Sequence, residues 1–136
     1  MPGFRTLPWV FHDLFKVRQQ AFEYTVAFAA GVSPSLAAAI PKKDGYAIRI
    51  TDIIFNIFTS AAQTLAIQDD ASTAVLIGEF PSGSAVGTHH LEYGTVGFPA
   101  TTSKNVDIVA SAAGYAGTLQ ILGYYEAIGP FTPATL

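Results

Sequence analysis

Turn-forming residues recur every few positions along most of this sequence and leave little room for helices that could pack together. From residue 22 onward, glycines, prolines and an Asp-Gly pair separate short segments in which apolar and polar residues alternate. Such alternation predicts strands with one buried face, and parallel strands would need crossover helices, which the pattern does not offer. We therefore expect an all-β fold, an antiparallel β-sandwich or jelly roll of about seven or eight strands with a short N-terminal arm.

The longest expected strand spans Tyr46–Thr59. Its apolar positions run through Ile48 and Ile50 and then change phase to Ile53 and Phe55. Because successive side chains of a strand point to opposite faces, a change of phase needs an extra residue or a change of sheet. The segment therefore predicts a β-bulge, or a switch between sheets, in the middle of the strand.

Other segments are shorter. Segment 73–80 is almost entirely apolar, which predicts a central strand buried on both faces. Segment 32–43 contains two prolines and an alanine-rich run, so we expect a loop there with at most one helical turn. Further strands are expected at residues 22–30, 65–67, 88–93, 104–110 and 118–126.

A difference in charge divides the chain into an arm, residues 1–21, and a single β-sandwich domain, residues 22–136. The arm has a net charge of +2, whereas the whole chain carries −3. Residues 9–22 of this region repeat apolar side chains at a helical period, but a segment this short needs a surface to lie on. That surface is either the chain's own β-sandwich or a partner, and we favour a partner. The side chains expected to bind it are Trp9, Phe11, Leu14 and Phe15.

Charged residues are scarce. Asp, Glu, Lys and Arg make up 12% of the chain, and hydrophobic residues make up 50%. Either the surface is built from Ser, Thr, Gln and Asn, or other protein covers much of it. Surfaces that other subunits cover lose charge, so we favour the second explanation and expect an obligate homo-oligomer. The net negative charge argues against nucleic acid as a partner. The longest uncharged stretches are interrupted by Gly, Pro or polar residues, so we expect no membrane span.

Candidate chemistry centres on His90 and Glu92, which share one face of an expected strand at positions i and i+2. His89 points to the opposite face, so the two histidines cannot serve one ligand set. The pair could hold a metal if a symmetry axis brought in further copies, but a solvated hydrogen bond is its commoner role. We therefore expect no metal ion and no cofactor.

No motif indicates an enzyme. Jelly-roll enzymes of the cupin type bind metal through a His-x-His pair, and the run 88–92, Thr-His-His-Leu-Glu, lacks that pair. The chain has no cysteine, no serine in a G-x-S-x-G elbow and no glycine-rich phosphate loop. The adjacent acids Asp69 and Asp70 are expected to be solvated in a turn. We expect no catalytic residues.

Four runs of residues carry a family resemblance. The runs are 65–70 (LAIQDD), 92–99 (EYGTVGFP), 104–109 (KNVDIV) and 111–119 (SAAGYAGTL). They resemble runs in small structural proteins of tailed bacteriophages, where a Gly-x-Ala-Gly turn, here at 114–117, leads into the closing strand. The resemblance covers residues 46–126 and implies a capsid decoration (cement) protein, a homotrimer bound to the major capsid protein on the virion surface. It implies no site residues.

Aromatic residues gather in and around the last strands. Core packing is their usual role, but a cluster of rings can also form a contact patch for a neighbouring subunit or a sugar. The alternative function is therefore a carbohydrate-binding β-sandwich module of a viral spike or fibre. The residues are Tyr93, Phe98, Tyr115, Tyr124 and Tyr125.

Overall fold

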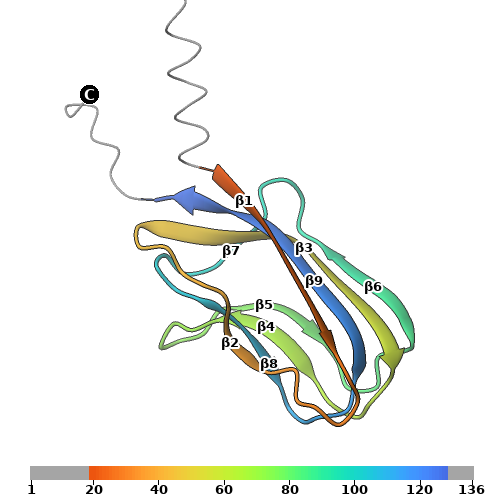
Figure 1. Ribbon diagram of the computed structural model, residues 1–136. Helices are drawn as coiled ribbons and strands as arrows, with labels where there is room; N and C mark the ends of the chain where they lie inside the picture. Colours follow the sequence, from red (N-terminus) through yellow and green to blue (C-terminus); the bar gives the residue numbers. More distant parts are fainter. Residues whose placement is uncertain (1–18, 129–136) are drawn as a thin grey trace, which may run out of the picture.

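The computed structural model describes residues 19–128, and in this part of the chain every regular element is a strand. Two antiparallel sheets pack face to face (Figure 1), which confirms the predicted β-sandwich. No helix among the described residues is long and apolar enough to cross a membrane. The strands are β1 (Gln19–Phe28), β2 (Leu36–Ile40), β3 (Tyr46–Thr59), β4 (Leu65–Asp69), β5 (Leu76–Phe80), β6 (Gly87–Glu92), β7 (Phe98–Pro99), β8 (Val106–Ala110) and β9 (Ala116–Ala127).

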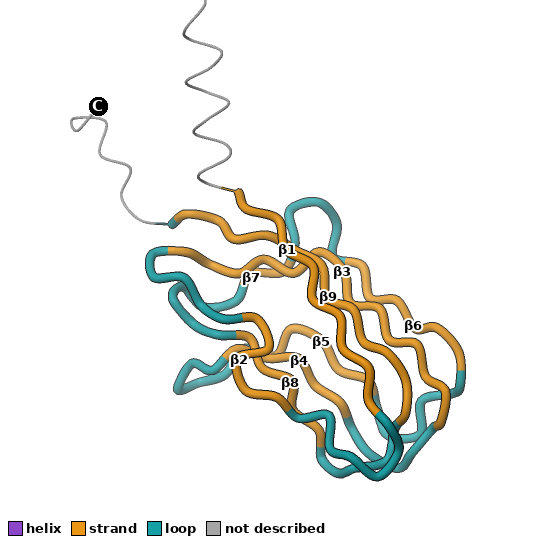
Figure 2. The backbone as a smooth tube through the Cα atoms, viewed as in Figure 1, coloured by secondary structure: helices purple, strands orange, loops and turns teal. Residues whose placement is uncertain are grey.

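The first sheet, called sheet A, contains the three longest strands. Its order is β1-β9-β3-β6, and the short β7 also pairs with β3. The second sheet, sheet B, has the order β2-β8-β4-β5. Figure 2 shows the long strands of sheet A crossing the molecule above the shorter strands of sheet B.

The core lies between the two sheets and follows the predicted alternation. Inward positions of β8 and β9 are almost fully buried, among them Val106, Ile108, Leu119 and Ile121. The ring of Phe55 lies near the centre of this core, with ring centroids of Phe28, Phe80 and Tyr115 within 5.6 Å of its own. The amphipathic pattern of the sequence therefore predicted which faces become buried.

The phase change in β3 is a β-bulge, as predicted. The pairing of β3 with β9 shifts register between Ile50 and Asp52, so Thr51 is the additional residue. Ile50 and Ile53 are nevertheless both fully buried. The bulge lets the strand keep one apolar face while turning Asp52 to the outer face.

The N-terminal part of the structure differs from the prediction. β1 already begins at Gln19 and pairs with the end of β9, starting at Gln19–Glu126. The helical period expected over 9–22 is therefore wrong for residues 19–22, because pairing with β9 overrides a weak local pattern. The predicted partner-binding residues Trp9, Phe11, Leu14 and Phe15 lie outside the described residues.

Two further expectations are wrong. The alanine-rich segment expected as a loop contains β2, which pairs irregularly with β8 and has Ala38 at φ 53°. β5 was expected to be central and buried on both faces, but it is an edge strand of sheet B, with Leu76 and Glu79 exposed. In both cases the position in the sheet, rather than composition, decides the structure.

The two ends of the sandwich differ in charge. Loops 29–35, 60–64, 81–86 and 111–115 meet at one end, and none of them contains Asp, Glu, Lys, Arg or His. We call this the uncharged end. Loops 41–45, 70–75, 93–97 and 100–105 form the opposite, charged end, where β1 begins and β9 finishes (Figure 1). All three lysines of the described residues, Lys42, Lys43 and Lys104, lie in these loops.

Candidate functional site

Three polar side chains meet on the outer face of sheet A. Asp52 follows the bulge of β3, and His90 and Glu92 lie on the neighbouring strand β6. Asp52 is the direct cross-strand partner of Glu92, and His90 is paired with Ile54. Alternation along β6 places His90 and Glu92 on one face, as predicted, and the register of β3 adds Asp52 to them.

The distances within this group are short. Nε2 of His90 lies 2.8 Å from Oδ1 of Asp52, and Nδ1 of His90 lies 4.0 Å from Oε1 of Glu92. One donor atom from each of the three residues lies within 4.8 Å of the other two. Asp52 is half-buried, whereas Glu92 is largely exposed. The imidazole therefore lies between two carboxylates at a surface that water can reach.

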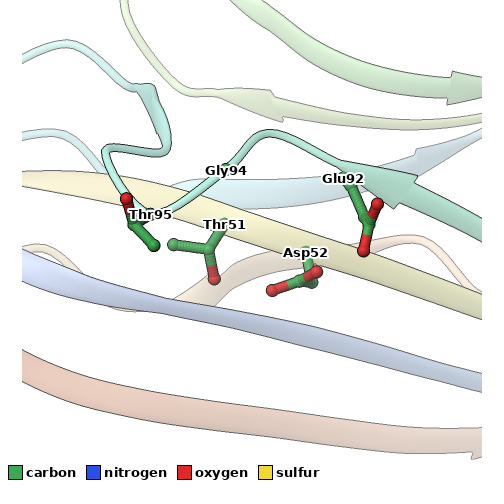
Figure 3. Close-up of a pocket in the computed structure, with 5 residues that line it drawn as sticks. All are labelled: Thr51, Asp52, Glu92, Gly94 and Thr95. Atoms are coloured by element: carbon green, nitrogen blue, oxygen red, sulfur yellow. The ribbon is translucent and has the colours of Figure 1, made fainter.

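An open cleft of about 500 Å³ adjoins the group and is lined by Thr51, Asp52, Glu92, Gly94 and Thr95. Figure 3 shows these residues coming from β3, the end of β6 and the loop that follows it. The loop is held against the bulge because the amide of Tyr93 donates to the carbonyl of Thr51 at 2.8 Å. The bulge thus turns Asp52 to the outer face and places Thr51 in the wall of the cleft.

His89 lies on the opposite face of β6, as the sequence predicted. Its Nε2 is 2.6 Å from the carbonyl oxygen of Ala85, and its ring centroid lies 6.4 Å from that of Phe80. Neither His89 nor His90 has a described hydrogen bond to a serine or threonine hydroxyl. The observed contacts of the two rings therefore assemble no base–nucleophile pair of the serine hydrolase type.

The charges around the group are unbalanced. Arg49, the only arginine among the described residues, pairs with Glu126, and Lys42 lies 3.6 Å from Asp44 at the charged end. The side chain of Lys43 donates to Gln20. No described ion pair joins a lysine or arginine to Asp52 or Glu92. Among the described residues, the imidazole of His90 is therefore the ionisable group that lies within 4.0 Å of both carboxylates.

Asp69 is not solvated, contrary to expectation. The residue is fully buried, and its carboxylate accepts from the amides of Ala71, Val75 and Thr101 at 2.8 to 3.2 Å. Burial alone would raise the pKa of Asp69, but the hydrogen bonds from Thr101, Val75 and Ala71 outweigh it and lower the pKa below its usual value. Asp69 is thus a structural carboxylate that holds loops of the charged end.

The tyrosines of the aromatic cluster also make structural contacts. The hydroxyl of Tyr93 donates to the carbonyl of Ile77, that of Tyr124 to Val96, and that of Tyr125 to Pro41. Burial raises the pKa of Tyr93 and of Tyr125 above the usual value, so both remain neutral donors. None of the five residues lining the cleft is aromatic. The cleft therefore offers no ring for stacking against a sugar.

Sequence reasoning found two members of the group and missed Asp52. The phase change after Ile50 was a usable signal, because it marks Asp52 as an outward-facing acid beside a bulge. The pairing of β3 with β6 could not be predicted from the sequence, because Asp52 and Glu92 are 40 positions apart.

Comparison with known proteins assigns the chain to no family. No protein-family model matches the chain, and no curated protein matches it.

Proposed function

We propose that the chain is a structural protein of a tailed-bacteriophage virion, a decoration protein that binds the major capsid protein and coats the shell as a homotrimer. The resemblance of residues 46–126 to such proteins suggests this role. The observation that carries it is the uncharged end of the sandwich, whose four loops contain no Asp, Glu, Lys, Arg or His.

The uncharged end suits contact between subunits. Phe58 and Val86 are 58% and 64% exposed there, and each follows or precedes a member of the last β3–β6 pair, Ile57–Gly87. The loops are also joined to one another, for example by the bond from the amide of Gly83 to the carbonyl of Ala61. A surface that is ordered, uncharged and partly apolar loses little solvation when a subunit covers it.

The charged end suits attachment to the shell. β1 begins there, so the basic arm joins the sandwich at the end that also carries Lys42, Lys43 and Lys104. The net charge of +2 on the arm can steer the protein toward an acidic surface of the capsid. Trp9, Phe11, Leu14 and Phe15 would then supply the apolar contacts of attachment.

Light scattering of the purified protein at micromolar concentration tests self-association. We expect a trimer for the wild type and monomers for the Phe58→Lys and Val86→Asp variants, because each places a charge in the buried contact. Val96→Asp is the matched control: Val96 is 67% exposed but lies at the charged end, so this variant should remain a trimer. A monomeric wild type, or equal behaviour of all variants, would contradict the proposal.

Cosedimentation with undecorated capsids tests attachment. Deletion of residues 1–18 keeps β1 complete, so the melting temperature should be nearly unchanged while capsid binding is lost. A variant that binds capsids normally, or that melts many degrees lower, would show that the arm does not serve as the attachment segment. A glycan array distinguishes a decoration protein from the alternative, a carbohydrate-binding module, because a decoration protein should show no sugar preference.

A further inference from the structure

We infer that Asp52, His90 and Glu92 form a binding site for a divalent transition-metal ion on the outer face of sheet A. This site is independent of the proposed role in the virion. The sequence supplied two ligands, which is too few, and the structure supplies the third from a neighbouring strand.

The backbone geometry places the three ligands together without the help of a flexible loop. His90 and Glu92 are separated by one residue on β6, and Asp52 is paired with Glu92 across the ladder to β3. Ligands on paired strands are held at fixed spacing, so most of the ordering cost of a metal site is already met by the fold.

The separations fit a metal ion after small side-chain adjustments. With Zn²⁺–ligand bonds of about 2.0–2.2 Å, the donor atoms of a tetrahedral site lie roughly 3.4 Å apart. One donor atom from each of the three residues already lies within 4.8 Å of the other two. The 2.8 Å contact with Asp52 and the 4.0 Å contact with Glu92 are made by different nitrogens of the His90 ring. The ring of His90 must turn so that one nitrogen and both carboxylates face the same point. The exposure of His90 and Glu92 leaves room for that rotation.

The charges of the site favour a cation. Two carboxylates directly opposite each other on antiparallel strands repel. The half-buried carboxylate of Asp52 also loses part of its hydration. Among the described residues, Arg49 pairs with Glu126 instead, so neither Asp52 nor Glu92 receives a salt bridge from a lysine or arginine. A divalent ion would neutralise both carboxylates and connect the edge strand β6 to β3.

The ligand types select the class of metal. One imidazole nitrogen with two carboxylate oxygens suits Zn²⁺, Co²⁺, Ni²⁺ or Mn²⁺, whereas Mg²⁺ and Ca²⁺ prefer oxygen ligands alone. The adjoining cleft, with Thr51, Gly94 and Thr95 in its wall, leaves space for water at the remaining coordination positions. Three protein ligands and open positions describe an exchangeable site rather than a closed structural one.

Zinc titration of the full chain against a chromogenic chelator tests the inference. We expect one Zn²⁺ per chain, a melting temperature that rises with Zn²⁺, and an affinity that falls at least tenfold in Asp52→Asn and in His90→Gln. Matched controls are His89→Gln, the adjacent histidine on the opposite face, and Glu23→Gln, an exposed acid on β1 of the same sheet. Both controls should bind Zn²⁺ within about twofold of the wild type.

Three results would overturn the site: no saturable binding at one ion per chain, unchanged affinity in His90→Gln, or equal loss in His89→Gln. The first would mean that the side-chain contacts of His90 with Asp52 and Glu92 are the only links within the group. If Asp52→Asn fails to fold, Glu92→Gln replaces it, because this side chain is 74% exposed and its loss leaves packing intact. Unchanged zinc affinity in Glu92→Gln would likewise contradict a three-ligand site.

Discussion

At the charged end of the sandwich two carboxylates join the loops in addition to neutral groups, whereas at the uncharged end the loops are joined through neutral hydroxyl groups. Asp69 accepts from amides in loops 70–75 and 100–105, and Asp70 accepts two bonds from Asn105. At the opposite end, the hydroxyl of Tyr115 donates to the carbonyl of Pro81 and accepts from the amide of Ser84.

This difference shows how a chain poor in charge uses the few charges it has. Hydrogen bonds to an ionised group are roughly twice as strong as neutral ones, so a single buried carboxylate can organise several backbone amides. An end held by neutral groups instead remains free of charge and can be covered by another protein without the cost of desolvating ions. The two ends should therefore respond differently to mutation and to pH.

Asp69→Asn should have the largest effect on stability. The amide keeps the shape of the side chain but removes its charge and turns one acceptor into a donor, which then faces an amide of Ala71, Val75 or Thr101. We expect the free energy of unfolding to fall by about 2–4 kcal/mol. Urea unfolding measures this. The control is Asp44→Asn at the same end, which is highly exposed and should change stability by less than about 0.5 kcal/mol.

Tyr115→Phe should have a smaller effect, because it removes a neutral group. The hydroxyl is buried and bonded at 2.9 Å to Pro81 and 3.2 Å to Ser84, so we expect a loss of about 1–2 kcal/mol. Tyr124→Phe is the matched control, since its hydroxyl makes one bond at an exposed position and its loss should be within about 0.5 kcal/mol. Equal losses in the two variants would remove the distinction between a buried and an exposed hydroxyl.

Acid should destabilise the charged end selectively, and this is the smallest effect. The pKa of Asp69 is lowered in the folded state, so its contribution is complete above the unfolded pKa and is lost as pH falls through the folded pKa. Wild type and Tyr115→Phe should therefore lose stability in parallel below about pH 4. Asp69→Asn should lose less over that range. Parallel curves for all three proteins would show that Asp69 does not titrate as inferred.

Much of the fold was predictable from local patterns. Alternation placed Leu119 and Ile121 inward, and the phase change in Tyr46–Thr59 predicted the bulge that the structure contains. The candidate site was predictable only in part. His90 and Glu92 were recognised as neighbours on one face, but Asp52 could join them only through a strand register that no local pattern encodes.

The sequence by itself determined the class of fold, the inward faces of the long strands and the bulge in β3. These follow from side-chain alternation, which acts between residues close in the chain. Only the tertiary structure decided that β5 lies at an edge, that Leu36–Ile40 is a strand, that Asp69 is buried and that Asp52 faces Glu92. The physical reason is that sheet order and register depend on non-local pairing, whose energy comes from partners distant in sequence.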